Sequence, residues 1–352
     1  MTVKMPKSKI KSYKIPKAPQ TYNATPRKNE KGSALIVVLA LIALASVLAA
    51  SSVATSRKSR HLTASIAQKT YSAYFSEGAA ARIQWLILND RNMFPERSLG
   101  GERLDMEKER YNADGTIREM DYYGVAIKYR ILDAASGIDI SGSGNQARKN
   151  LETLKPSDDD QEKADRYRIF MNRFEDYIDA NDLIRIDGME FEEYRDIGIY
   201  PLPRNNQMEF KEEILLIPGS TEFFGADAGG KLSGVRTIAP KGMPKIPGQT
   251  SFFNASKDMV MSYTGMESED ADLVLEAREE WFSTGRQLSD SLEPGKYTML
   301  KSKFSFNESG VYSIEIDSSP NADRAGKKLF LAVRIANQIS NPGIRYYEWM
   351  SY

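Results

Sequence analysis

The sequence predicts an α+β protein in which a long N-terminal helix packs on a β-sheet, and a large all-α insertion interrupts that sheet. Three observations support this fold class. A helical pattern begins in a charge-free run, residues 32–56, and continues well beyond it. Segments rich in β-branched and aromatic residues stand both before and after a block of helical patterns. That order is expected when an insertion splits one sheet.

The charge-free run predicts a membrane-spanning helix. Its 25 residues would span about 37 Å at about 1.5 Å per residue, enough for the roughly 30 Å hydrocarbon core of a bilayer. Residues 1–32 carry eight Lys and one Arg against one Glu. This Lys- and Pro-rich arm lacks apolar periodicity, so we expect it to be unstructured and cytoplasmic, with the rest of the chain across the membrane.

The residues leave three fates open for this segment. It is an uncleaved signal anchor, a secretory signal cut near Ser52–Ala54, or a helix that a prepilin peptidase releases by cutting after Gly32. The apolar run exceeds the usual signal-peptide core, which argues against the second fate. The third fate is indicated by Gly32, which stands directly between Lys31 and the apolar run.

The helical pattern extends from Ser33 to about Asn89. Four residues on its later half share one stripe by their spacing of seven, four and three: Tyr74, Ala81, Trp85 and Leu88. We expect this stripe to pack on the chain's own sheet, with partner helices covering the inner half. Substitution of Trp85 by Asp should then unfold the domain, because it would bury a charge.

Further elements follow from periodicity and capping signals. Strands are predicted at 122–132, 297–306, 311–317, 329–335 and 344–349, and helices at 161–178 and within 254–281. Within the last range, Asn254 or Ser256 can cap a first helix and Gly265 separates it from a second. Glu212–Ile217 is expected to be a short helix or turn.

Composition excludes several kinds of chemistry. The 352 residues include no Cys and a single His, His61, so disulfides, thiol nucleophiles, Cys-ligated metals and multi-His sites are ruled out within one chain. The basic residues concentrate in the N-terminal arm, which leaves an acidic body and argues against nucleic-acid binding. We expect no catalytic residues.

One segment concentrates oxygen ligands. Eight acidic or amide side chains fall within 18 residues, from Asp176 to Glu193. Such ligands suit Ca²⁺, but their spacing is not that of an EF-hand. From the residues alone we favour a solvated acidic helix end followed by a loop, with a calcium site as the alternative.

Taken in order, five stretches of this chain resemble the K-type minor pseudopilins of type II (general) secretion systems. The first resembles a prepilin cleavage site, the next a conserved strand, and the third the acidic core of the family. The stretches are Lys31–Val37, Ala126–Ile140, Phe174–Asp182 with Asp187–Tyr194, Phe210–Gly219 and Phe253–Gly265. Departures are a long leader, Tyr177 in place of a Trp, and Asp139-Ile140-Ser141 in place of Asn-Leu-Asn. Val37 stands where ordinary pilins carry a Glu, and K-type members lack that Glu too.

The resemblance implies a non-enzymatic subunit at the tip of a pseudopilus, which assists the export of folded proteins across the outer membrane. Its implied partners are the I-type and J-type minor pseudopilins and the inner-membrane secretion platform. It implies a single-pass protein of the bacterial inner membrane with a periplasmic C-terminal domain. It also implies cleavage between Gly32 and Ser33, methylation of the new N-terminus, and structural Ca²⁺ held by Asp176, Asp179, Asp182, Asp187 and Glu190.

The expected fold is a pilin-like α+β domain, in which the long N-terminal helix packs on an antiparallel sheet, with a large all-α insertion. The chain divides accordingly into a cleaved leader, a transmembrane half-helix, a periplasmic half-helix with the first strands, the insertion, and closing strands: 1–32, 33–56, 57–140, 141–290 and 291–352. Two alternatives remain: a minor pilin of a type IV pilus, and a membrane-anchored periplasmic hydrolase that uses carboxylates.

Overall fold

The computed structural model describes residues 33–94, 97–101, 109–142, 144–156, 160–226, 230–246, 248–319, 327–335 and 344–351. The chain forms two compact units, residues 1–64 and 65–352. The leader, including Gly32, lies outside the described residues.

Helix α1 runs without a break from Ser33 to Met93, four residues past the end expected from the sequence. It contains no Pro and a single Gly, Gly78, so no residue forces it to stop earlier. Among the described residues it is the one helix long and apolar enough to cross a membrane. In the first unit its apolar side chains from Leu35 to Leu48 are exposed, as a bilayer-facing helix requires.

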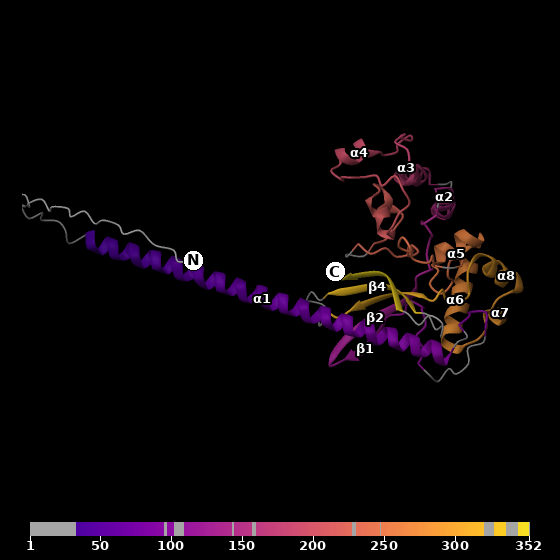
Figure 1. Ribbon diagram of the computed structural model, residues 1–352, viewed down its shortest axis with the longest axis horizontal. Helices are drawn as coiled ribbons and strands as arrows, with labels where there is room; N and C mark the ends of the chain where they lie inside the picture. Colours follow the sequence, from indigo (N-terminus) through magenta and orange to yellow (C-terminus); the bar gives the residue numbers. More distant parts are fainter. Residues whose placement is uncertain are drawn as a thin grey trace, which may run out of the picture. The chain divides into compact units, whose positions relative to one another are not determined.

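The sheet has five antiparallel strands in the order β1-β2-β3-β4-β5. Their bounds are Arg118–Tyr122, Val125–Asp133, Val311–Asp317, Lys328–Ile335 and Ile344–Ser351. Strands β2 and β3 are neighbours in the sheet although the whole insertion separates them in the chain, as the ribbon shows (Figure 1). The predicted α+β class with a split sheet is therefore confirmed.

The insertion contributes mostly short helices. In chain order they are α2 Gly144–Leu151, η1 Glu152–Leu154, α3 Gln161–Ile178, α4 Phe191–Asp196, η2 Lys211–Leu216, η3 Ser220–Glu222, α5 Lys257–Thr264, α6 Ser268–Thr284, α7 Leu288–Ser291 and α8 Pro294–Lys303. The predicted capping signals hold. The Ser256 hydroxyl accepts a hydrogen bond from the backbone N–H of Met259, and Gly265 ends α5 in the left-handed conformation.

Two strand predictions need correction. Residues 297–306 are not a strand, because Pro294 opens helix α8 at its first position and Lys301 and Lys303 lie in its last turn. The helical block thus extends beyond residue 290. Residues 122–132 are not one strand either: Tyr122 ends β1, and a turn at Tyr123 and Gly124 leads into β2.

The core between α1 and the sheet uses small and aliphatic residues of the helix. Ala79, Ala80, Ile83 and Ile87 are fully buried against Ile131 and other residues of β2, β3 and β4. The expected stripe is turned away: Tyr74 and Trp85 are 67% and 61% exposed, and Ala81 is also exposed. Only Leu88 reaches the edge of the core. The prediction that the stripe packs on the sheet is wrong, because the helix lies close to the sheet through its smaller side chains.

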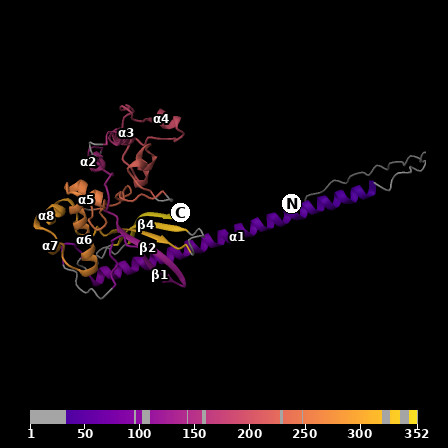
Figure 2. The same ribbon diagram turned by 180° about the vertical axis from the view of Figure 1, so that it is seen from behind.

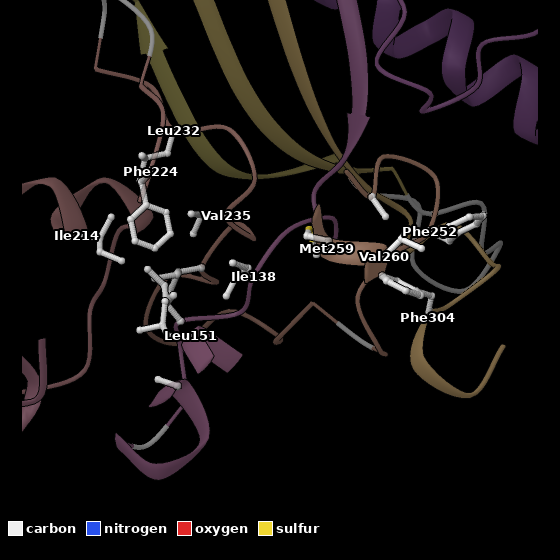
Figure 3. Packing of buried hydrophobic residues seen from close by; sticks show 14 of the residues in the cluster. Ile138, Leu151, Ile214, Phe224, Leu232, Val235, Phe252, Met259, Val260 and Phe304 are labelled. Atoms are coloured by element: carbon white, nitrogen blue, oxygen red, sulfur yellow. The ribbon is translucent and has the colours of Figure 1, made fainter. Parts of the chain in front are cut away.

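A second core holds the insertion together. Helix α3 buries one apolar face, on which Phe170 and Phe174 are fully enclosed. Figure 3 shows how distant segments contribute to this core: Leu151, Ile214, Phe224 and Val235 lie around one region, and Phe252, Val260 and Phe304 around another.

Candidate functional site: an exposed helix face and an acidic loop

A buried ion network fixes the C-terminal end of α1 to the sheet. Asp90 pairs with Arg91, Arg97 and Arg110, all nearly buried. Glu308 binds Arg91 at 2.5 Å and Arg97 at 3.1 Å. Burial raises the pKa of Glu308, but these two guanidinium groups outweigh it and hold that pKa below its usual range. The network sets the rotation of α1 at this end.

About four turns before this network, two serine hydroxyl groups fix α1 to the residues that follow β3. The Ser72 and Ser76 hydroxyls lie 2.6 and 2.7 Å from the Ser318 hydroxyl, just after β3. The backbone N–H of Lys327 also donates to the Ser72 hydroxyl at 2.7 Å. All three serines are buried, so these contacts hold the serine side of the helix toward the sheet.

The opposite side of α1 is therefore presented outward as an aromatic surface. Tyr71, Tyr74 and Trp85 are between 61% and 67% exposed. Large aromatic side chains gathered on one exposed helix face are typical of a protein–protein contact rather than of a solvated surface. We call these residues, together with Ala81, the outward face.

The acidic loop is organised around Arg185, which the sequence pattern did not identify as part of a site. Asp176 is fully buried, and its carboxylate accepts from the backbone N–H groups of Arg185 and Met189 at 3.2 and 3.0 Å. The Arg185 guanidinium donates to both Asp176 and Asp179, at 2.5 and 2.6 Å, and pairs with Glu175 at 2.9 Å. The sequence signal for this ion pairing was Arg185 itself, a basic residue within a run of acidic residues.

The other predicted ligands are spread along the loop. The Asp182 carboxylate accepts from the Asn205 amide at 3.0 Å, and Asp187 pairs with Arg168 at 3.1 Å. No three of the described carboxylates form a metal-binding group as they stand. Arg185 supplies the positive charge that the predicted cation would supply.

Glu190 departs from this pattern. It is 7% exposed, and neither carboxylate oxygen has a hydrogen-bond partner among the described residues. Burial, followed by the charges of Asp176, Asp179 and Asp182, raises the pKa of Glu190 to about 7. A buried acceptor without a donor is costly, and a cation would satisfy it. Glu190 and these three neighbours do not form a metal-binding group as they stand, and Arg185 already holds Asp176 and Asp179.

Glu190 predicts a pH dependence of stability. The pKa of Glu190 is higher in the folded chain, about 7, than the ordinary value of 4.5 for an unfolded chain, so the folded form binds the proton more tightly. Protonation of Glu190 therefore increases the free energy of unfolding as the pH falls from about 7 to 4.5. We expect the melting temperature to rise between pH 8 and pH 6, and the rise to shrink in Glu190→Gln. An identical pH profile in the variant would contradict the assignment.

Calcium at the acidic loop remains a prediction. If the folded chain alone binds the ion, stability rises by about 2.7 kcal/mol at a hundredfold excess over Kd. We expect millimolar Ca²⁺ to raise the melting temperature above its value in EDTA, and Asp179→Ala to abolish the increment. A melting temperature indifferent to Ca²⁺ would leave the loop as a structure held by Arg185 alone.

Known proteins support the fold directly. The sequence itself matches neither a family model nor a curated protein. Among solved structures, the chain is similar to a chain in "The Crystal Structure of the GspK-GspI-GspJ complex from enterotoxigenic Escherichia coli Type 2 Secretion System". The match has a TM-score of 0.50 at 14% identity and covers 82% of this chain and 99% of that one. The chain has a pilin-like fold. This similarity confirms the expected architecture of a long helix, an antiparallel sheet and added helices.

Proposed function

We propose that this protein is a K-type minor pseudopilin at the tip of a type II secretion pseudopilus, where it assists the export of folded proteins across the outer membrane. The observation that carries the proposal is the outward face of α1 on a pilin-like domain. The helix is long, held to its own sheet by buried contacts, and still exposes Tyr74 and Trp85. A chain acting alone gains nothing from such a face.

The proposed partners are the I-type and J-type minor pseudopilins, with the inner-membrane platform beneath them. Helices pack on one another by interdigitating side chains at spacings of three and four residues. Tyr74, Ala81 and Trp85 stand seven and four residues apart, so they lie on one side of α1, the side proposed to meet a neighbouring helix. The charge-free part of α1 would anchor the chain once in the inner membrane, with the basic leader in the cytoplasm.

Co-expression tests the assignment. We expect the full chain to co-purify from membranes with the I-type and J-type pseudopilins of its own secretion system, and secretion to fail when its gene is deleted. Loss of a surface pilus with intact secretion would instead support the minor pilin of a type IV pilus.

Processing provides a separate prediction. The placement of Gly32 between Lys31 and the apolar helix predicts a mature protein that begins at a methylated Ser33. Intact-mass measurement of the membrane-extracted chain decides this. An N-terminus at Met1 or near Thr55 would show that the prepilin assignment is wrong.

Two carboxylate-bearing pockets among the described residues do not fit the hydrolase alternative. Glu276, Glu280 and Glu293 line a pocket of about 500 Å³. There Ser291 and Arg286 lower the pKa of Glu280, whereas a general acid needs a raised pKa. Asp133, whose pKa burial raises to about 6, lines a cavity of only about 80 Å³. Neither arrangement suits a sugar or peptide substrate.

A further inference from the structure

Three cations stand directly beyond the charge-free run of α1: Arg57, Lys58 and Arg60. We call them the basic cluster. Both ribbon views show α1 passing through this stretch as an unbroken helix (Figures 1 and 2), and all three residues are exposed. At about 100° per residue they fall within about 160° of the helix circumference, so they share one side. The helix carries no acidic residue before Glu77, so none of the three has an ion-pair partner three or four residues away.

The position of the basic cluster along α1 corresponds to the far headgroup layer of a bilayer. The hydrocarbon core is about 30 Å thick and each headgroup layer adds about 5–8 Å, which correspond to about 20 and about four residues of helix. Counted from Ser33, the hydrocarbon core ends near Ser52, within the more polar stretch Ser51–Ser56. The phosphates then lie level with the next turn of the helix, residues 53–57. Long Arg and Lys side chains bend back toward that layer, so all three cations reach it.

Nothing within α1 neutralises the basic cluster, and membrane orientation does not require it. One to two turns earlier, the Ser51 and Thr55 hydroxyls are satisfied by backbone carbonyls of α1 at 2.9 Å, whereas a cation needs an anion or water outside the helix. Residues 1–32 carry eight Lys and one Arg, which suffice to hold the leader in the cytoplasm. Cations on the opposite side oppose that orientation, so their presence there indicates a role other than topology.

We propose that the basic cluster binds the phosphate groups of anionic phospholipids in the leaflet opposite the leader, and thereby fixes the depth of α1 in the bilayer. This inference rests on the membrane anchor of the proposed function. Phosphate is the occupant because the cluster lies at the layer in which phosphates are concentrated, and because the fork of an Arg guanidinium matches two phosphate oxygens. A subunit that leaves the bilayer for a pseudopilus must break these contacts, so the cluster opposes extraction until partner helices replace the lipid.

Lipid titration tests the occupant. The full chain in neutral detergent is titrated with phosphatidylglycerol or phosphatidylcholine, and bound lipid is counted by native mass spectrometry. Each cation near an anionic headgroup strengthens binding about fivefold, so Lys58→Gln with Arg60→Gln should weaken phosphatidylglycerol binding about twentyfold and leave phosphatidylcholine binding unchanged. Lys69→Gln with Arg82→Gln is the matched control, because it removes the same two side-chain types from exposed positions of α1 beyond the headgroup layer. We expect the control to bind both lipids like the parent chain.

The depth of α1 is measured with a single label. The chain has no Cys, so Ser56→Cys carries one environment-sensitive dye beside the basic cluster. We expect acrylamide to quench this dye less in vesicles of equal parts phosphatidylglycerol and phosphatidylcholine than in vesicles of phosphatidylcholine alone. Lys58→Gln with Arg60→Gln should remove that difference. Equal quenching of the parent chain in the two kinds of vesicle would overturn the role in depth.

The titration also has outcomes that overturn the lipid site. These are equal phosphatidylglycerol binding by the double variant and the parent chain, and an equal loss in the control, which would reduce the effect to net charge. Displacement of the lipid by inorganic phosphate at matched ionic strength would replace the lipid site by a site for a free anion.

The proposed function fails in a different way. Release of the chain from membranes by alkaline carbonate would overturn the anchor and this inference with it. Phosphatidylglycerol selectivity in a chain that does not co-purify with other pseudopilins would overturn the pseudopilin role and leave the lipid site standing.

Discussion

Asp in place of Ile83 is expected to unfold residues 65–352, whereas Asp in place of Trp85 is expected to leave their melting temperature unchanged. The two positions lie two residues apart on the same helix, but Ile83 is fully buried in the core between α1 and the sheet and Trp85 is 61% exposed. A carboxylate at Ile83 would lie in an apolar core without a partner, at a cost of about 4 kcal/mol or more.

Thermal or urea unfolding of the fragment 65–352, which forms one compact unit, measures this difference. In the full chain, Trp85→Asp should instead abolish co-purification with the partner pseudopilins. Two equally destabilised variants would show that both faces of α1 are buried in the folded domain. A Trp85→Asp chain that still assembles would remove the observation on which the proposed function depends.

The comparison of these two positions also shows where the sequence misled. Periodicity identified a stripe of apolar residues on α1, but the helix has two apolar faces. The stripe with the larger side chains was predicted to be buried, whereas the face with the smaller side chains packs on the sheet. Ala79 and Ala80 give no strong signal in a sequence, yet close approach of a helix to a sheet requires residues of that size. The serine contacts and the Asp90 network, which set the rotation of α1, join segments far apart in the chain, so local patterns cannot reveal them.

Elsewhere, unambiguous local signals in the sequence predicted helix ends correctly. The cap at Ser256 and the stop at Gly265 were predicted because each has a local physical cause. The strand prediction for residues 297–306 is wrong because two local signals conflict there. Tyr297, Phe304 and Phe306 favour a strand by composition, whereas Pro294 and the basic last turn favour a helix. Short aromatic segments are ambiguous between the two states.

The acidic loop illustrates the same limit for a site. Counting carboxylates found Asp176, Asp179 and Glu190, but could not show that Arg185 turns inward to the first two while Glu190 stays without a donor. A run of carboxylates in a sequence can be neutralised either by a bound metal ion or by an arginine side chain, and composition does not distinguish the two. Which one neutralises the loop depends on backbone geometry, including Gly188, where any Cβ would overlap the Asp176 carboxylate.

Removal of the arginine gives the second large expected effect. In Arg185→Ala the Asp176 carboxylate keeps its two backbone donors but loses its ion pair while fully buried. Breaking a buried pair typically costs 3–5 kcal/mol. Since about a third of the Arg185 side chain is exposed, we expect about 2 kcal/mol, measured by urea unfolding in EDTA.

Arg195→Ala is the matched control. Its guanidinium pairs with Glu192 three residues earlier on the surface, with both side chains more than half exposed, so its removal should cost less than about 0.5 kcal/mol. Calcium then separates the two accounts of the loop. If the ion and Arg185 compete for Asp176 and Asp179, the stabilisation by Ca²⁺ should be larger in Arg185→Ala than in the parent chain, because the variant leaves those carboxylates open. An Arg185→Ala chain that is weakened but equally indifferent to Ca²⁺ would show that the loop is built for the arginine and not for the metal.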